Sequence, residues 1–206
     1  SGTWNDLSGN QNHAKRHASP KAEQHKPSDQ QVVRYHSKSN DYHEFKEIKN
    51  IRTVFWVMSK TSGNSGSPLC HPNAHHFYSN GDKFWHPQHT HEHIRKGNLR
   101  INGMEANAES NYPNKLAVVS LRTTGNVIAS RMGKDRNHGG KYNWNGEIGE
   151  VLIFSKALND EQIKRVENHL IEKWKVKRET DIQYAKPMAY LSFDDRNGNR
   201  YPNLAN

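Results

Sequence analysis

Gly146-Glu-Ile-Gly-Glu-Val-Leu-Ile-Phe154 is the segment that decides the fold, because it is the most strand-like run in the chain. It is rich in β-branched and aromatic residues, which favour strands over helices. A second run of this kind is Ile51-Arg-Thr-Val-Phe-Trp-Val-Met58, where apolar and polar residues partly alternate. The two runs predict a protein built on β-strands.

Several shorter strands are expected between turn signals. Asn102-Gly103 is a strong signal for a two-residue hairpin, whereas residues 1–31 are so polar that they predict a long loop. No helices alternate with the strands, which favours an antiparallel sandwich over a parallel α/β sheet. The shorter strands are expected at residues 32–35, 75–78, 83–85, 90–94, 98–101, 116–121 and 127–130.

One helix is predicted after the strand that ends at Phe154. Asn159 can cap its first turn, and Gln162 stands at the third helical position, as in a capping box. Apolar residues then follow the helical period and form a single stripe. We expect this stripe to dock on the sandwich; it consists of Ile163, Val166, Leu170 and Trp174.

The composition limits the size of the core. The chain has 206 residues, which is one ordinary domain or one domain plus a fragment. Only 32% of the residues are apolar and the mean hydropathy is −1.09, so the core must be thin, as in a two-layer sandwich. The single cysteine, Cys70, excludes an internal disulfide framework and a cysteine-based zinc cluster.

The charge balance points to polyanionic partners. Thirty Lys and Arg against twenty-one Asp and Glu give a net charge of +9. No helix-turn-helix, zinc-finger spacing or RNP-type motif accompanies this charge, so we expect no nucleic-acid partner. We also expect no membrane insertion, because no apolar run is long enough to cross a bilayer and the predicted helix carries mixed charges.

Two motifs resemble a known family. Trp4-Asn-Asp-Leu-Ser-Gly-Asn-Gln-Asn-His-Ala14 is similar to a signature of bacterial LamG-like domains, and the run from Gly146 to Trp174 is similar to their closing strand, turn and helix. The resemblance implies an all-β fold: an antiparallel β-sandwich jelly roll (concanavalin A-like) over residues 4–174, with one C-terminal helix packed on it. Residues 175–187 would be a linker, and residues 188–206 a final strand or the start of a following module.

The resemblance also sets expectations about function and location. This superfamily includes lectins, binding modules, parts of adhesins and glycan-degrading enzymes, so the fold alone does not choose between them. It implies an extracellular or cell-surface location, as part of a larger exported bacterial protein. The first motif has a structural interpretation as well: Asp6 and Ser8 can accept backbone N–H bonds, and Gly9 can supply a left-handed residue.

The sequence shows no recognisable catalytic motif, so no catalytic residue is expected. Sandwich glycosidases need two carboxylates on one strand face, whereas Glu147 and Glu150 are three residues apart and are expected on opposite faces. Of the alginate-lyase motifs, only Lys141-Tyr142-Asn143 gives a faint match. No G-x-S-x-G elbow, P-loop or dinucleotide fingerprint is present.

The stretch His86-Pro-Gln-His-Thr-His-Glu-His93 places four histidines in eight positions. His89, His91 and His93 alternate, so we expect them on one face of a strand, where they could bind Zn²⁺ or Ni²⁺ opportunistically. Three ligands in a row on one strand rarely converge, so exposed positions without a dedicated metal are favoured. Ca²⁺ remains an option for this superfamily, through Asp6, Asp82, Asp194 or Asp195, but no spacing is specific.

A glycan-binding face is predicted where aromatic and basic residues gather. Sugar rings stack on aromatic side chains, and acidic groups take charge-assisted bonds from Arg, Lys and His. Trp85 and Trp144 are as consistent with core positions as with a site. The predicted carbohydrate-binding residues are Tyr78, Lys83, Trp85, His86, Arg131, Arg136, His138, Tyr142 and Trp144.

The sequence therefore favours a non-catalytic carbohydrate-binding module for an acidic (uronic or sulfated) glycan. Its expected partners are an acidic polysaccharide and the neighbouring domains of the same chain. Two alternatives stay open: an adhesion or spacer module of a large surface protein, and a divergent polysaccharide lyase.

Overall fold

The computed structural model describes residues 2–61, 63, 65–74, 77–136 and 142–178. The chain divides into a compact unit, Ser1–Val176, and a second unit, Lys177–Asn206. The strand expected at 188–193 and most of the expected linker lie outside the described residues. The elements are β1 (Thr3–Trp4), β2 (Ala14–His17), β3 (Lys21–His25), β4 (Gln30–Tyr35), a 3-10 turn (Ser37–Ser39), β5 (Tyr42–Lys60), β6 (Leu69–Cys70), α1 (Glu92–Arg95), β7 (Asn98–Ile101), β8 (Met104–Ala106), β9 (Ala117–Met132), β10 (Gly146–Phe154) and α2 (Asp160–Trp174).

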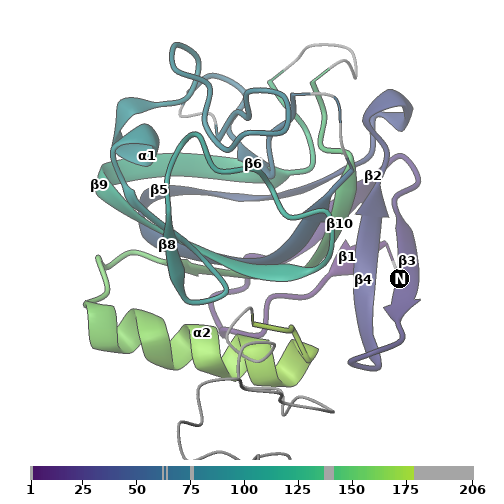
Figure 1. The fold of residues 1–206 in the computed structure, drawn as a ribbon. Coiled ribbons are helices and arrows are strands. Elements are labelled where there is room, and N and C mark those ends of the chain that lie inside the picture. The colour runs from purple at the N-terminus through teal and green to yellow at the C-terminus, as the bar shows by residue number, and fades with distance from the viewer. Residues whose placement is uncertain (1, 62, 64, 75–76, 137–141, 179–206) are drawn as a thin grey trace, which may run out of the picture. The chain divides into compact units, whose positions relative to one another are not determined.

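Two long strands, β5 and β9, form the centre of the sheet (Figure 1). The main path of hydrogen-bonded neighbours runs β3-β4-β10-β5-β9-β7-β8. The first residues of β5 pair instead with β2, and the last residues of β9 pair with β6. The register between β5 and β9 shifts between Glu44 and Thr53. On its other edge, β5 pairs with β2 before this region and with β10 after it.

Every pair of named strands is antiparallel, and the expected all-β class with a C-terminal helix is confirmed. The arrangement is compatible with a β-sandwich.

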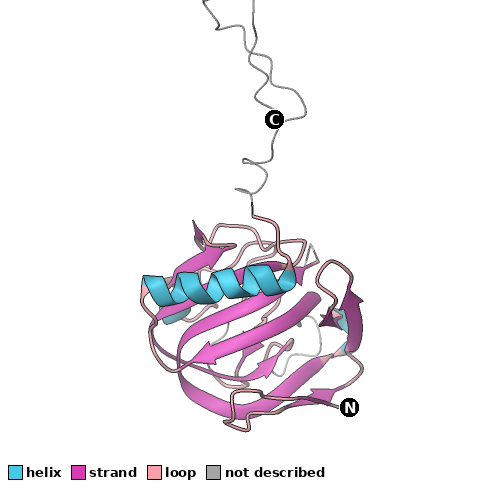
Figure 2. Ribbon diagram, turned by 90° about the horizontal axis from the view of Figure 1, so that it is seen from below, coloured by secondary structure: helices cyan, strands magenta, loops and turns pink. Residues whose placement is uncertain are grey.

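Both faces of β5 are buried from Thr53 to Lys60, which explains the nearly continuous apolar run in this half of the strand. Val54, Trp56 and Met58 belong to a large cluster on one face, together with aromatic side chains from the loops between β6 and β10. Phe55 and Val57 belong to a second cluster on the opposite face, which α2 covers. Figure 2 shows α2 lying across this face of the sheet. The core is therefore two thin layers, as the low apolar content predicts.

Helix α2 forms as its sequence predicts. The side-chain oxygen of Asn159 accepts from the backbone N–H of Gln162 at 2.9 Å, and the Gln162 side chain accepts from the Asn159 N–H at 3.0 Å. Ile163, Leu170 and Trp174 of the predicted stripe are buried against the sheet. Neither described helix is long and apolar enough to span a membrane.

Two local predictions about turns are confirmed. Strands β7 and β8 form a hairpin with Asn102 and Gly103 at its tip, both with positive φ (50° and 84°), as a tight hairpin turn requires. In the amino-terminal motif, the Asp6 carboxylate accepts the backbone N–H groups of Ser8 and Asn12, each at 2.8 Å. The carboxylate therefore holds the loop together.

Other predictions of secondary structure were wrong. Residues 1–31 contain β1, β2 and β3, mostly exposed strands whose polar side chains hide the strand pattern. Residues 90–94 do not form a strand, because His91 caps the short helix α1 by accepting from the backbone N–H of His93. Within residues 83–85, Lys83 makes two isolated bridges, to Asn80 and Asn111, and no strand forms. Residues 75–76 lie outside the described residues. The strands expected at 116–121 and 127–130 are parts of β9.

The expectation that Glu147 and Glu150 lie on opposite faces is also wrong. A β-bulge shifts the register between Ile148 and Glu150, so that Glu147 pairs with Ser59 and Glu150 with Val57. Ser59 and Val57 are two residues apart on β5 and therefore share the face that α2 covers. On that face each carboxylate has its own partners. Glu147 binds Arg34 and Ser59, and Glu150 binds Lys173 and the Trp174 indole.

We expect Gly149→Ala to destabilise the protein by about 1–3 kcal/mol, the usual cost of overpacking. A Cβ atom at Gly149 would lie 2.4 Å from the Trp174 ring, which is itself buried between α2 and the sheet. Gly2→Ala is the matched control, because a Cβ there meets nothing within 4 Å. Urea unfolding of both variants measures the difference, and equal stabilities would contradict the packing of Trp174 on this bulge.

A second prediction concerns pH. His43 is buried and hydrogen-bonded to the Tyr35 hydroxyl at 2.8 Å; burial, then the charges of Arg16 and His17, lowers the pKa of His43 to about 4. The unfolded chain, with a histidine pKa of about 6.5, binds more protons in this range, so stability is full above pH 6.5 and falls as the pH drops toward 4. We expect a loss of about 3 kcal/mol in the free energy of unfolding. Urea unfolding between pH 7.5 and 4 should show this slope, and His43→Gln should flatten it.

Candidate functional site

The two tryptophans of the predicted glycan-binding face belong to the core. Trp85 is 2% exposed and Trp144 is 0% exposed, and both rings contact Tyr112 edge-on. A sugar ring can stack only on an exposed aromatic face, so neither residue can take the role predicted for it. The loops that carry these residues fold over the sheet and supply its largest aromatic cluster.

Other residues of the predicted face do come together. The Tyr78 ring lies 5.8 Å from the His86 ring and 5.7 Å from the Tyr142 ring, so the two segments that carry them are adjacent. His89 stacks on His86 with 4.3 Å between the ring centres. Tyr78 is only 8% exposed, however, which leaves little ring surface for a sugar. His138 lies outside the described residues.

The cations predicted for this face already bind carboxylates. Lys83 pairs with Glu109, and Arg131 donates to Glu44 at 2.8 Å while it lies over the Tyr42 ring. The Arg136 guanidinium lies 3.8 Å from the carboxylate of its neighbour, Asp135. An acidic ligand at this face would have to displace one of these carboxylates from each cation.

The three alternating histidines do not form the expected row. His89 pairs with His86 in the loop before α1, whereas His91 and His93 lie with ring centres 5.1 Å apart on α1 and its cap. Burial and the neighbouring His93 charge lower the pKa of His91. Among the described residues, no group of three or more His, Cys, Asp or Glu is arranged to hold a metal ion.

The aspartates considered for Ca²⁺ have internal roles where the structure describes them. The Asp6 carboxylate binds two backbone N–H groups of its own loop. Asp82 accepts from the Gly63 N–H at 2.8 Å and lies 3.3 Å from the buried Lys60 ammonium. A hydrogen bond from the Ser8 side chain, then the backbone N–H groups of Ser8 and Asn12, lowers the pKa of the Asp6 carboxyl. The Gly63 N–H, then Lys60, lowers the pKa of the Asp82 carboxyl. Asp194 and Asp195 lie outside the described residues.

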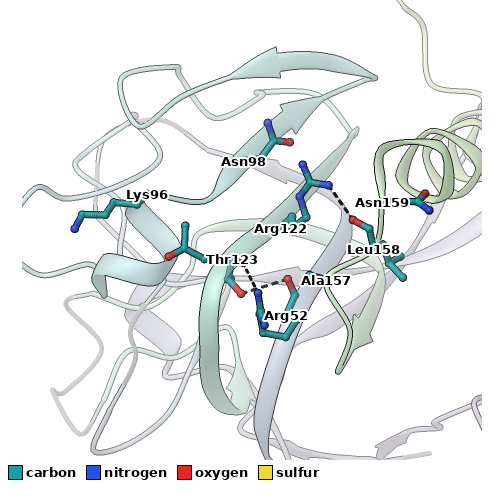
Figure 3. Close-up of a pocket in the computed structure, with 9 residues that line it drawn as sticks. Arg52, Lys96, Asn98, Arg122, Thr123, Ala157, Leu158 and Asn159 are labelled. Atoms are coloured by element: carbon teal, nitrogen blue, oxygen red, sulfur yellow. Dashed lines mark hydrogen bonds between the residues drawn. The ribbon is translucent and has the colours of Figure 1, made fainter.

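A different site lies at the start of α2, where four segments of the chain meet (Figure 3). It is an open groove with a volume of about 560 Å³, and we call it the basic groove. Its lining combines three cations with amide, hydroxyl and apolar groups and contains no aromatic ring. The lining residues are Arg52, Lys96, Asn98, Arg122, Thr123, Thr124, Ala157, Leu158 and Asn159.

Backbone carbonyl groups orient the two arginines of the basic groove. Arg122 donates from Nη1 to the Leu158 carbonyl at 3.0 Å, and Arg52 donates from Nη2 to the Thr123 carbonyl at 3.4 Å (Figure 3). A carbonyl fixes a guanidinium without cancelling its charge. Arg122 also pairs with Asp160, whose side chain is 76% exposed, at 2.8 Å.

The wall opposite α1 is anchored by one buried side chain. The Thr53 hydroxyl donates to the Lys156 carbonyl at 2.9 Å and accepts from the Leu158 N–H at 3.1 Å. These two bonds hold the turn between β10 and α2 against β5. The groove therefore has a fixed wall on this side. Asn159, the N-cap residue of α2, lines the groove next to this wall.

One histidine of the stretch His86–His93 borders the other side of the groove. The Nδ1 atom of His93 is 3.0 Å from the hydroxyl of Thr124, which lines the groove. Lys96, at the end of α1, is 3.0 Å from Glu92 in an exposed pair. The stretch His86–His93 thus reaches the groove through helix α1. The strand that its alternating histidines predicted does not form.

Sequence reasoning missed Arg52, Lys96 and Arg122. Arg52 and Arg122 stand at strand positions where a charged residue among apolar ones indicates only an outward-facing side chain. Their proximity depends on the pairing of β5 with β9, in which Thr53 lies opposite Arg122. No signal in the sequence brings these two positions together.

Comparisons with models of protein families, with curated proteins and with solved structures found no match to this chain.

We expect Zn²⁺ titrated into chelator-treated protein to show no tight stoichiometric site. The imidazoles of His89, His91 and His93 belong to two separate pairs, and a tight zinc site needs three or four converging ligands. Calorimetry measures this directly. A single site that disappears with His91→Ala would overturn the expectation.

Proposed function

We propose that this chain is a non-catalytic carbohydrate-binding module that recognises an acidic, uronic or sulfated, glycan through the basic groove. The observation that carries the proposal is the presence of three cationic side chains in one open groove, two of them oriented by backbone carbonyls. Guanidinium groups bind carboxylates and sulfates through two parallel bonds, which gives both strength and direction.

The lining favours a charged sugar over a neutral one. Neutral glycans are usually held by stacking on aromatic rings, and no aromatic ring lines this groove. Asn98 is exposed in the groove, where an amide can bond to sugar hydroxyls. The net charge of +9 also attracts polyanions over longer distances.

The groove supports binding more than catalysis. Glycoside cleavage needs an acid and a base on either side of the bond, whereas the one carboxylate described at this groove, Asp160, is paired with Arg122. Glu147 and Glu150, the closest match to a glycosidase pair, lie on the face that α2 covers. The resemblance to LamG-like domains fits a module of a larger exported bacterial protein at the cell surface.

We expect Arg52→Ala and Arg122→Ala each to weaken binding of a sulfated oligosaccharide by about tenfold or more, as the loss of a hydrogen bond to a charged group implies. Arg165→Ala is the matched control, because this exposed arginine of α2 pairs with Glu161 and does not line the groove. Calorimetry at two salt concentrations should show weaker binding at high salt, with a sulfated dextran oligomer and oligogalacturonate as acidic probes and dextran as the neutral one.

Other results would support other functions. Equal losses in all three arginine variants would contradict a site in the groove. Absence of binding to both acidic probes would favour a spacer or adhesion module, and release of shortened products would favour a lyase. Tighter binding of single-stranded DNA than of either acidic glycan would point to nucleic acid instead.

A further inference from the structure

Arg122, which lines the basic groove, forms an ion pair with an acidic side chain of the same protein. Its Nη1 atom lies 2.8 Å from the Oδ1 atom of Asp160, the first residue of α2. The Asp160 side chain is 76% exposed and that of Arg122 is 29% exposed. The pair therefore lies at the surface of the groove, where an ion pair is weak and water or another anion can replace either partner.

Arg122 does not depend on Asp160 for its orientation. The same Nη1 atom donates to the Leu158 carbonyl at 3.0 Å, and Thr53 fixes the turn that carries this carbonyl. A guanidinium has five N–H donors, and both of these contacts use Nη1. Arg122 can therefore exchange one carboxylate for another while its side chain stays in place.

We infer that Asp160 is the internal counter-ion of the groove, and that an acidic group of the glycan replaces its carboxylate at Arg122. This inference rests on the proposed function. A uronate carries the same chemical group as Asp160, and a sulfate ester offers similar oxygens to the guanidinium. Asp160 thus marks the position of one acidic group of the ligand.

After replacement, Asp160 stays charged and close to the ligand. It lies in the first turn of α2, where the helix dipole favours a negative charge. Its carboxylate therefore opposes binding twice: it competes for Arg122 in the free protein, and it repels the acidic group in the complex. Asp160 therefore lowers the affinity of the groove for acidic ligands by a modest factor.

The next residue along α2 provides a matched control. Glu161 lies in the same first turn, its side chain is 81% exposed, and it pairs with Arg165 instead of Arg122. Asp160→Asn and Glu161→Gln each remove one negative charge from the start of α2 with almost no change in size. The two substitutions therefore have the same effect on the net charge and on the favourable interaction with the helix dipole, but only Asp160→Asn frees Arg122.

The test measures the affinity of each variant for the sulfated dextran oligomer and for oligogalacturonate. We expect Asp160→Asn to tighten binding by about threefold to fivefold, because a competing surface ion pair is removed, and Glu161→Gln to change it less than twofold. In the background of Arg122→Ala, Asp160→Asn should have no more effect than Glu161→Gln. Circular dichroism verifies the helix, and Asp160→Ser is a second variant if Asp160→Asn does not fold.

The outcomes separate the two proposals. If Arg52→Ala and Arg122→Ala weaken binding but Asp160→Asn equals Glu161→Gln, the groove binds the glycan and the role of Asp160 is wrong. If Asp160→Asn weakens binding, Asp160 positions Arg122 and does not compete with the ligand, which also overturns the inference. If the wild type binds neither acidic probe, or binds them unchanged after both arginine substitutions, the proposed function itself fails.

Discussion

The pairing of β5 with β9 is the constraint on which the rest of the structure depends. These strands run antiparallel along most of their length, and their side chains alternate between the loop-covered face and the face under α2. Because both faces are buried, a shift of one residue would exchange the two apolar layers, and the register is strongly fixed. That register places Arg52 and Arg122 near each other at one end of the sheet, next to the turn that leads into α2.

The position of α2 is fixed by polar contacts as well as by apolar packing. Glu167 is 2% exposed and accepts from Arg100 of β7 at 3.0 Å and from the Ser120 hydroxyl at 2.6 Å. A buried carboxylate is tolerated only when its charge is paired and its oxygens are bonded, so these contacts specify where the helix lies. At the other edge of the same face, the indole of Trp174 donates to Glu150 at 2.7 Å. The start of α2, and with it one wall of the basic groove, follows from this placement.

Much of the fold was predictable because local rules decide it. The capping box at Asn159, the hairpin tip at Asn102-Gly103 and the apolar runs of β5 and β10 each depend on neighbours in the sequence. The failures have a common physical origin, since they depend on tertiary pairing. The bulge at Gly149 reverses the side to which Glu150 points, and the histidine alternation that predicts a strand is overridden by the cap of α1. Likewise the sequence leaves Trp85 and Trp144 equally consistent with the core and with a site, and the inward folding of their loops over the sheet places both in the core.

The same dependence explains why basic residues alone did not locate the groove. The net charge of a sequence treats every cation alike, whereas the structure shows which group each cation binds. Arg131 donates to a carboxylate on the adjacent strand, and the attraction between the two charges leaves little field for a ligand. Arg52 instead donates to a carbonyl, which bears no net charge, so its orientation is fixed while its charge remains. In the same groove, Arg122 and Lys96 must first release exposed carboxylates, Asp160 and Glu92, before their charges can act on a ligand.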